Sequence, residues 1–312
     1  MRLAVQMDPI ETVDVDADTT FALMEEAQAR GAQMWVYSPN ELSWNEGRIL
    51  ARARSVTVKH VQGEHADLGD EVMLDLAEDV DVILMRQDPP FDMAYITAAH
   101  ILEGLKGKTL VLNDPFWVRS SPEKIIPLEF PELIPPTLIS RDVQAIKDFR
   151  AKHQDIIIKP LYGNGGAGVF RLRPDDGNLN SLLEMFFGQS REPVIAQAFL
   201  PAVEKGDKRV LLVDGEPVGA INRVPLKGET RSNMHVGGRA EESGLDADDL
   251  RICAAIGPML KERGLMLVGI DVIGGLMTEI NVTSPTGVQE LKRFSGIDTC
   301  ARFWDAVSTQ LN

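Results

Sequence analysis

The sequence predicts an α/β protein that begins with a parallel, helix-covered sheet and continues into a part built on antiparallel strands. Three observations predict this class. Short apolar strands alternate with helices over residues 1–112, a strand, a glycine loop and a second strand occupy residues 156–172, and two hairpins follow toward the C-terminus. With 312 residues, the chain is long enough for two or three domains.

The N-terminal part contains four apolar runs with the composition of strands. They are Leu3–Met7, Met34–Tyr37, Val80–Met85 and Thr109–Leu112. Asp18 or Thr19 caps a helix that Gly31 closes, and a second helix covers Met93–Leu105. Ligands of parallel sheets bind beyond the carboxyl ends of the strands. Asp8 and residues 86–88 follow two of these strands, so they either contact a substrate or form ordinary turns.

A second part of the chain begins near residues 113–122. Ser121-Pro122-Glu123-Lys124 reads as an N-cap, a first-turn proline and an acid, which places Lys124 near the start of a helix. The elements predicted next are a strand at Thr137–Ile139, a helix capped by Asp142 that ends near His153, a helix at Asn180–Gly188 and a strand at Val194–Gln197.

A glycine-rich loop carries the clearest functional signal. A β-branched run ends at Lys159, the loop contains Gly163, Asn164, Gly165 and Gly166, and a strand resumes near Val169. Glycines let backbone N–H groups approach a ligand closely, so the loop and the lysine predict a flap over nucleotide phosphates. The G-x-G-x-x-G spacing does not predict a dinucleotide site, because that motif must open a helix, and the Walker sequence is absent. The alternative is a hairpin turn without a ligand.

The C-terminal part contains two hairpins separated by an irregular segment. Residues 209–213 and 216–222 flank an Asp214-Gly215 turn, and residues 268–273 and 276–282 flank Gly274-Gly275. Residues 223–244 lack any period and carry the cations Arg223, Lys227, Arg231 and Arg239, so they form either a disordered insertion or a lid. A helix from Asp246 or Asp248 should kink at Gly257-Pro258 and end at Gly264, and a last helix covers residues 299–310.

Three oxygen donors on the last hairpin predict a magnesium site. Glu279 and Asn281 are two residues apart on one strand and share a face, and Asp271 lies on the partner strand. Hard oxygen ligands of this kind suit Mg²⁺. Asp271 joins the same face only if the turn is odd in length or the hairpin carries a bulge. The alternative is a solvated polar face.

Composition excludes several classes of protein. The net charge of −15 argues against nucleic acid as a partner. The only cysteines, Cys253 and Cys300, form no metal or disulfide pattern, and no apolar run approaches the length of a membrane span or a signal sequence. We therefore expect a cytoplasmic protein that binds no membrane.

Residues 1–310 resemble the prokaryotic glutathione synthetases, which are ATP-grasp ligases. The matching segments are Met7-Asp8-Pro9-Ile10, residues 86–92, Glu123-Lys124, Lys159-Pro160-Leu161 with the glycine loop, residues 206–210, Gly228-Glu229-Thr230-Arg231 and residues 278–286. The resemblance implies an N-terminal (pre-ATP-grasp) substrate-binding domain at 1–122 and a two-lobed ATP-grasp domain. Its small lobe with the glycine flap would span 123–193, and its C-terminal lobe 194–312 with the lid 223–244. It also implies a homotetramer.

The resemblance further implies that ATP drives the ligation of γ-glutamylcysteine and glycine through an acyl phosphate. The implied ATP-binding residues are Lys124, Lys159, the glycine loop, Gln197, Ala198, Phe199 and Leu200 at the adenine, and Asp207 near the ribose. Asp271, Glu279 and Asn281 would hold Mg²⁺ or Mn²⁺. Asp8, Arg223 and the turn Ser284, Pro285, Thr286 would face the substrates, and Arg209, Arg231 and Arg239 would stabilise the transferring phosphoryl group.

One position departs from the wider ATP-grasp pattern. D-alanine ligase relatives carry an arginine two residues before the metal-binding aspartate, where this chain has Gly269. The cation that stabilises the transition state must then come from another position, and Arg209 is the predicted residue. Three rival interpretations remain at this point: a nicotinamide-dependent dehydrogenase, a nucleotide-binding module without catalysis, and an ATP-grasp ligase for other amino acids.

Overall fold

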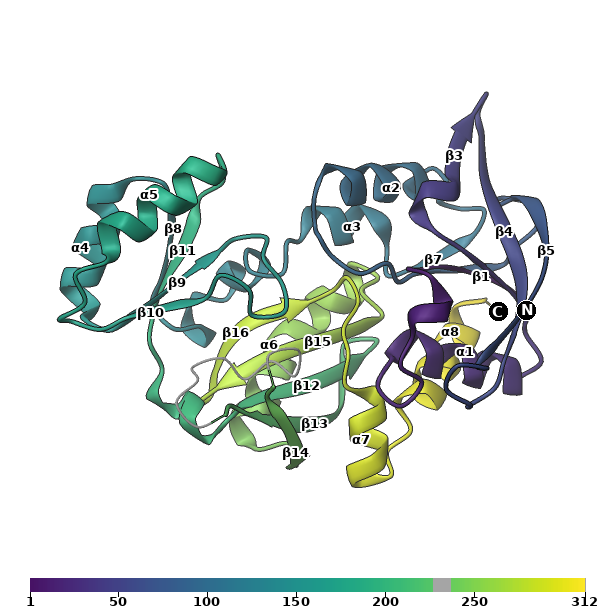
Figure 1. Cartoon of the computed structure of the whole chain (residues 1–312). Coiled ribbons are helices and arrows are strands. Elements are labelled where there is room, and N and C mark those ends of the chain that lie inside the picture. Colours follow the sequence, from purple (N-terminus) through teal and green to yellow (C-terminus); the bar gives the residue numbers. More distant parts are fainter. Residues whose placement is uncertain (227–236, 312) are drawn as a thin grey trace.

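The structure is a computed structural model that describes residues 1–226 and 237–311. The described residues form three sheets, which define an N-terminal domain, a small lobe and a C-terminal lobe. Figure 1 shows the N-terminal domain and the small lobe on either side of the C-terminal lobe. None of the described helices combines the length and apolar composition that a membrane crossing needs.

The N-terminal sheet contains four adjacent parallel strands, as predicted. In spatial order they are β2 (Gln33–Tyr37), β1 (Arg2–Gln6), β6 (Val82–Met85) and β7 (Leu110–Leu112). The strand order reverses between β1 and β6, because the chain leaves β1 toward β2 and later returns to the other side of β1. This reversal fixes the place where a ligand of such a sheet is expected.

The sheet is mixed rather than wholly parallel. An antiparallel extension consists of β3 (Leu42–Asn45), β4 (Arg48–Val58) and β5 (Ala66–Asp75), with β4 paired to β2. Along β4, buried Ile49, Ala51 and Ala53 alternate with residues that are less buried. This alternation is typical of a strand with one face on the core, and the sequence analysis did not use it.

Helix predictions in this domain are confirmed except at the domain boundary. Asp18 caps α1 (Thr19–Ala29) and Asp92 caps α2 (Met93–Glu103). The predicted helix start at Ser121 is wrong, because α3 (Pro115–Ser120) begins earlier, with Asp114 as its cap, and Ser121 follows its end. Lys124 therefore lies in a turn that precedes a 3₁₀ helix, η3 (Ile126–Glu129).

The small lobe is a four-stranded antiparallel sheet with two helices packed on it (Figure 1). Its strands in spatial order are β10 (Phe170–Leu172), β9 (Ile156–Pro160), β11 (Val194–Ala198) and β8 (Thr137–Ser140), and its helices are α4 (Val143–His153) and α5 (Leu179–Gln189). The glycine loop joins β9 to β10, so a strand follows it and the dehydrogenase interpretation is wrong. β11 pairs with β8 and β9, which moves the end of the lobe from the predicted residue 193 to Ala198.

The C-terminal lobe is a five-stranded antiparallel sheet. Its strands in spatial order are β14 (Arg239–Ser243), β13 (Glu216–Val224), β12 (Asp207–Val213), β15 (Leu267–Ile273) and β16 (Leu276–Asn281). Both predicted hairpins are confirmed. The segment 223–244 is not irregular throughout, since Arg223 and Val224 end β13 and residues 239–243 form β14. Lys227, Arg231 and the rest of residues 227–236 lie outside the described residues.

The helices of this lobe pack partly on the N-terminal domain. They are α6 (Ala247–Glu262), which continues through Pro258, α7 (Val288–Ser295), which the sequence analysis missed, and α8 (Thr299–Leu311). Trp304 on α8 donates from Nε1 to the carbonyl of Leu23 on α1 at 2.8 Å. The two larger apolar cores both combine residues of the N-terminal domain with residues of the C-terminal lobe, whereas a third core lies within the small lobe.

Candidate active site

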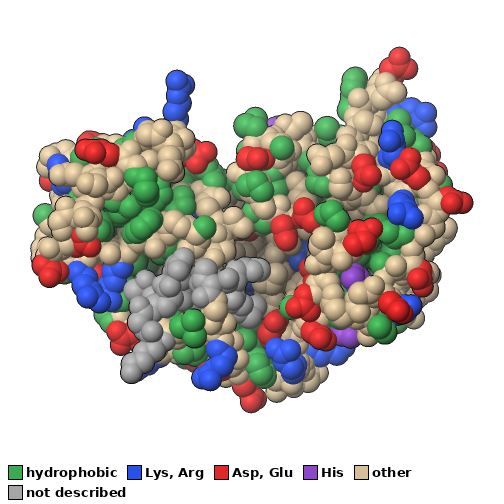
Figure 2. Space-filling model, in the orientation of Figure 1, with side chains coloured by type: hydrophobic (Ala, Val, Ile, Leu, Met, Phe, Trp, Pro, Cys, Tyr) green, Lys and Arg blue, Asp and Glu red, His purple; other side chains and the backbone are tan. Residues whose placement is uncertain are grey.

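A crevice of about 660 Å³ lies where the three parts of the molecule meet. Its walls come from the carboxyl ends of β1 and β6, the glycine loop, the end of β11 and the sheet of the C-terminal lobe. Figure 2 shows the hollow near the centre of the molecule, with acidic side chains gathered on its N-terminal-domain side. We refer to this space as the crevice below.

The structure brings nearly all of the predicted site residues into the lining of the crevice. Those present are Asp8, Lys124, Lys159, Gly163, Asn164, Gly165, Gly166, Gln197, Ala198, Phe199, Leu200, Asp207, Arg209, Arg223, Asp271, Glu279, Asn281, Ser284, Pro285 and Thr286. Arg239 is not among them; its side chain is 76% exposed and pairs with Glu241. Arg231 lies outside the described residues.

Two lysines converge below the glycine loop. Lys124 Nζ lies 2.7 Å from Glu279 Oε1 and also donates to the carbonyl of Gly163. Lys159 is 9% exposed and forms no ion pair with a carboxylate among the described residues. Burial lowers the pKa of Lys159, which means that its charge lacks sufficient compensation. An anionic ligand beside Lys159 would supply the missing negative charge.

The glycine loop adopts a backbone that other residues would not tolerate. Gly165, Gly166 and Gly168 have φ angles of 61°, 80° and 70°. A Cβ on Gly163 would lie 2.5 Å from Cγ of Pro160, so the loop also packs directly on the end of β9. The loop contacts the N-terminal domain through Tyr162, whose ring stacks on Phe91 with centroids 6.0 Å apart. It therefore covers the crevice between the lobes.

Apolar and aromatic groups line the crevice at the end of β11. Phe199 lies beneath the guanidinium of Arg171, with 3.5 Å between the Arg171 Cζ and the ring centroid, and Arg171 in turn pairs with Asp155 at 2.6 Å. Gln197 donates to Thr137 Oγ1 at 2.9 Å. These contacts fix a slot with apolar walls and polar edges, which is the usual character of a site for a planar base.

A β-bulge places the three predicted metal ligands on one face. The turn at Gly274-Gly275 has two residues, but the pairing shifts so that Asp271 lies opposite Glu279, while Val272 lies opposite Met277. Thr278 is the extra residue in β16. Directly opposed residues share a face, and Asn281 lies two residues beyond Glu279. The bulged register that the sequence analysis required is confirmed.

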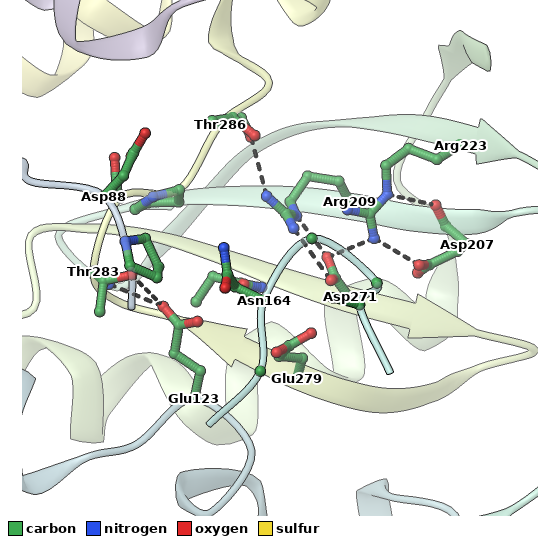
Figure 3. Close-up of a pocket in the computed structure, with 18 of the residues that line it drawn as sticks. Asp88, Glu123, Asn164, Asp207, Arg209, Arg223, Asp271, Glu279, Thr283 and Thr286 are labelled. Carbon is green, nitrogen blue, oxygen red and sulfur yellow. Dashed lines mark hydrogen bonds and ion pairs between the residues drawn. The ribbon is translucent and has the colours of Figure 1, made fainter. Parts of the chain in front are cut away.

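Asp271 is held by two arginines (Figure 3). Arg209 approaches it through Nε at 2.5 Å and Nη2 at 3.1 Å, and Arg223 lies 2.9 Å from Oδ1 and also pairs with Asp207 at 2.6 Å. Burial alone would raise the pKa of Asp271, but the two guanidinium groups outweigh it and hold the pKa well below its usual range. Asp271 is therefore ionised under all ordinary conditions.

Arg209 occupies the space that a side chain at residue 269 would fill. A Cβ on Gly269 would lie 3.0 Å from Cδ of Arg209 and 3.2 Å from Cβ of Pro285. Arg209 lies on β12, directly opposite Asp271 on β15, so its guanidinium reaches the same face as Asp271. This geometry is consistent with the prediction that Arg209 supplies the positive charge on the sheet face that carries Asp271.

Comparison with known proteins assigns the chain to a family. The N-terminal domain of prokaryotic glutathione synthetase matches residues 1–119, and the ATP-grasp domain of the same family matches residues 123–296. The chain belongs to the prokaryotic glutathione synthetase family. It is 59% identical to the glutathione synthetase of Brucella melitensis over 99% of both chains, and 58% identical to that of Mesorhizobium japonicum over 98% of both.

Solved structures agree with the fold. The D-cycloserine synthetase DcsG matches with a TM-score of 0.70 at 17% identity, over 100% of both chains. The ATP-grasp ligase PsnB, solved with a minimal precursor, matches with a TM-score of 0.64 at 18% identity. At these identities the matches show the ATP-grasp fold alone.

The oxygen donors of the last hairpin have the chemistry that a magnesium ion requires. Among the described residues no hydrogen bond reaches Glu279 Oε2 or Asn281 Oδ1, so both oxygens are open to the crevice. Both belong to the class of hard donors that Mg²⁺ prefers. The described residues do not gather three carboxylate, histidine or cysteine side chains anywhere, so the amide of Asn281 is needed to complete a set with Asp271 and Glu279.

The sequence analysis missed the role of Glu123. Its Oε1 accepts hydrogen bonds from Val282 N at 3.0 Å, Thr283 N at 3.1 Å and Thr283 Oγ1 at 2.7 Å. Burial and the charge of Glu279 raise its pKa. Glu123 thus holds residues 282 and 283, which follow β16, in place. The sequence could have indicated this role, because Glu123 precedes Lys124 in a segment that resembles the family.

Proposed function

We propose that the crevice joins γ-glutamylcysteine to glycine, with hydrolysis of ATP to ADP and phosphate. Membership of the glutathione synthetase family makes the chain an ATP-dependent ligase, and relatives of 55–59% identity over nearly the full length carry that name. The observation that best supports the proposal is the arrangement of buried charge. Lys159 and Lys124 lie at the glycine loop, and Arg209 lies on the adjoining sheet, where a carboxylate and a phosphoryl group could meet.

The reaction needs an activated carboxyl group, because a carboxylate is a poor electrophile. A cysteinyl carboxylate oxygen attacks the γ-phosphorus of ATP, the bond to the β–γ bridging oxygen breaks, and ADP leaves. The amine of glycine then attacks the acyl carbon of the acyl phosphate, the carbon–oxygen bond breaks, and phosphate departs as the nitrogen loses a proton. Arg209, which donates to Asp271 in the crevice, would stabilise the negative charge that develops in both steps.

The remaining roles follow from position along the crevice. Lys124, Lys159 and the glycine loop would hold the phosphates, residues 197–200 the adenine, and Asp207 would lie near the ribose. Mg²⁺ or Mn²⁺ bound by Asp271, Glu279 and Asn281 would neutralise phosphate charge. Arg223, which pairs with both Asp207 and Asp271, would keep these carboxylates in place beside the substrates.

We further propose that the lid predicted at 223–244 closes over the crevice during the reaction, apart from Arg223 and Val224, which belong to β13. An acyl phosphate hydrolyses if water reaches it, so closure would protect the intermediate. Arg231 and Arg239 would then reach the phosphoryl group. In the structure Arg239 pairs with Glu241 at the surface, so this role requires the end of β14 to move.

We propose two further properties, a cytoplasmic location and a homotetrameric assembly, from composition and family resemblance. Cys253 and Cys300 are free and buried, which suits the reducing conditions of the cytoplasm. The resemblance to the family suggests a homotetramer, which light scattering coupled to size-exclusion chromatography would measure.

The decisive experiment is a substrate panel read by phosphate release. We expect rapid release with γ-glutamylcysteine plus glycine, and slow release with γ-glutamylcysteine alone, with D-alanine pairs, or with glutamate plus cysteine. Glutathione should appear in equal amount to phosphate in the first reaction. Preference for another pair of amino acids would overturn the assignment, and ATP binding without turnover would indicate a non-catalytic module.

A further inference from the structure

Arg86 is a buried cation that has no role in the reaction proposed above. It lies at the carboxyl end of β6, is 6% exposed and lines the crevice. Its Nε donates to Thr20 Oγ1 at 3.1 Å and its Nη2 donates to the carbonyl of Pro285 at 3.1 Å. Within the described residues, no carboxylate forms an ion pair with it. Burial lowers the pKa of Arg86, as it does for Lys159 at the other end of the crevice.

Arg86 occupies the place where an open α/β sheet binds its ligand. The strand order reverses between β1 and β6, and the crevice is lined by residues that follow both strands, Asp8 after β1 and Arg86 and Asp88 after β6. A crevice at such a reversal point is the general ligand position in sheets of this type. This position is independent of the nucleotide machinery in the two lobes.

Four carboxylates line the same crevice as Arg86. They belong to Asp8, Asp14, Asp18 and Asp88. Three of them already bind the backbone: Asp8 accepts from Asp88 N at 2.8 Å, Asp14 from Asp16 N at 3.0 Å and Asp18 from Phe21 N at 2.6 Å. The carboxylate of Asp88 is exposed and receives no hydrogen bond from the other described residues. It is the group best placed to receive a cation from a ligand.

One short turn connects this acidic end to the reacting end. Arg86 holds the carbonyl of Pro285, and Arg209 donates from Nη1 to the carbonyl of the next residue, Thr286, at 3.2 Å. Figure 3 shows Asp88 on the opposite side of the view from Asp207 and Arg223, with Thr286 and Arg209 between them. A ligand that lies along residues 283–286 would thus have one end at Arg86 and Asp88 and the other at Arg209.

We propose that Arg86 binds the α-carboxylate, and Asp88 the α-ammonium, of the γ-glutamyl residue of the dipeptide substrate. The proposal rests on the dipeptide ligase activity proposed above and adds the direction in which the substrate lies. A γ-glutamyl group carries a carboxylate and an ammonium on one carbon, which matches a buried guanidinium beside a free carboxylate. The cysteinyl carboxylate, at the other end of the dipeptide, then points toward Arg209.

This arrangement makes Arg86 and Asp88 determinants of specificity. A substrate without the α-carboxylate would leave Arg86 buried without its anion, and a substrate without the α-ammonium would leave Asp88 facing an apolar carbon. Sites built to bind a polar group reject analogues that lack it, because the unpaired partner stays desolvated. The free α-amino acid head group, rather than the length of the chain alone, would be the recognised feature.

The test pairs each substitution with the substrate that lacks the matching group. Ligation to glycine is measured with γ-glutamylcysteine, with 4-aminobutanoyl-cysteine, which lacks the α-carboxylate, and with glutaryl-cysteine, which lacks the α-ammonium. Wild type should prefer γ-glutamylcysteine to 4-aminobutanoyl-cysteine by about a hundredfold in kcat/KM. Arg86→Met should lose about that factor for γ-glutamylcysteine and change by no more than about twofold for 4-aminobutanoyl-cysteine.

Asp88→Asn provides a second test that does not disturb a buried group. It should lower kcat/KM for γ-glutamylcysteine and for 4-aminobutanoyl-cysteine, which both carry the ammonium, and leave glutaryl-cysteine nearly unchanged. Arg52→Met is the matched control, because Arg52 lies on β4 with a side chain 56% exposed and outside the crevice. It should alter none of the three substrates.

The outcomes separate this inference from the proposed function. If wild type ligates none of the dipeptides, the proposed function fails. If wild type makes glutathione but Arg86→Met and Asp88→Asn lower all three substrates by the same factor, the residues are merely structural and the head-group assignment is overturned. If Arg86→Met does not fold, Asp88→Asn decides the question alone. An equal loss for all three substrates would overturn the assignment, and a loss confined to the two substrates with the ammonium would support it.

Discussion

At the level of single residues, the charge of Lys159 opposes folding and serves binding. Its burial without a carboxylate partner among the described residues destabilises the folded protein, while the same charge is available to phosphate. We expect Lys159→Met to weaken ATP binding by at least tenfold in titration calorimetry, and to raise the free energy of unfolding of the nucleotide-free protein by roughly 0.5–2 kcal/mol. Lys152→Met, at an exposed position of α4, should change neither quantity.

The pH dependence of this effect has a definite sign. The pKa of Lys159 is lower in the folded protein than in the unfolded chain, so its charge destabilises the fold fully at pH values below the folded pKa. The penalty disappears as the pH rises through the folded pKa toward the ordinary lysine value of about 10.4. The stability advantage of Lys159→Met should therefore be present at pH 7 and shrink in alkaline solution. An advantage that grows with pH would contradict the account.

Glu279 is the residue that tests the metal assignment. Glu279→Gln replaces a carboxylate that would bind Mg²⁺ and removes the ion-pair partner of Lys124. We therefore expect kcat to fall at least tenfold and half-maximal activity to require more Mg²⁺. Far-UV circular dichroism should be unchanged. Glu71→Gln, on exposed β5, is the control. Full activity of Glu279→Gln at ordinary Mg²⁺ concentrations would show that the metal assignment is wrong.

Residue type and order along the chain were enough to predict many of the residues that line the crevice. Lysine before a glycine loop and oxygen donors on a strand carry their chemistry with them, and the family resemblance located the remainder. Residues 86–88 were predicted either to contact a substrate or to form a turn, but the separate roles now proposed for Arg86 and Asp88 could not be predicted from the sequence. These roles depend on which carboxylates already accept hydrogen bonds from backbone N–H groups. They also depend on which cation is buried without an ion-pair partner among the described residues. Both are properties of the folded chain.

At the level of elements, the errors come from competing local signals. Asp114-Pro115 and Ser121-Pro122 both have the composition of a helix start, and only the first is followed by helix. The bulge at Thr278 could be required from the sequence but not located, because its place is set by the pairing of β15 with β16. The alternation in β4 was a usable signal that was not applied.

Helix α6 gives a case in which tertiary contact should reverse local propensity. Gly257 lies inside the helix, where alanine is normally favoured by about 1 kcal/mol. A Cβ there would lie 2.5 Å from the carbonyl oxygen of Gly215 in the β12–β13 turn, so neither backbone can yield easily. We expect Gly257→Ala to destabilise the protein by roughly 1–3 kcal/mol in thermal or denaturant unfolding.

The matched control lies in another helix of the same chain. Gly188 is inside α5, and a Cβ there would meet no atom within 4 Å. Gly188→Ala should follow propensity and stabilise the protein slightly, by roughly 0.5–1 kcal/mol. If both substitutions change stability in the same direction, the close contact between Gly257 and Gly215 does not govern the packing of α6.

At the level of the whole molecule, the N-terminal domain and the C-terminal lobe behave as one packed body. They share both larger apolar cores, and Asn113 ties them together by donating to the carbonyls of Leu267 and Val282 at 2.9 Å each. The small lobe has its own core and meets the rest through smaller contacts, such as that of Tyr162 with Phe91. Closure on a nucleotide is thus expected to move the small lobe.

Hydrogen exchange should reveal this division. Without nucleotide, amides of β9, β10 and β11 should exchange faster than those of β1, β12 and β15, because a separate and smaller core opens at lower free energy. ATP analogue and Mg²⁺ should slow exchange in the small lobe most, since the ligand bridges it to the C-terminal lobe. Lys159→Met should lose this protection at the same ligand concentration, while Lys152→Met should keep it. Uniform protection of all three sheets, with or without nucleotide, would mean that the small lobe does not open separately. Closure of the crevice would then not come from movement of the small lobe.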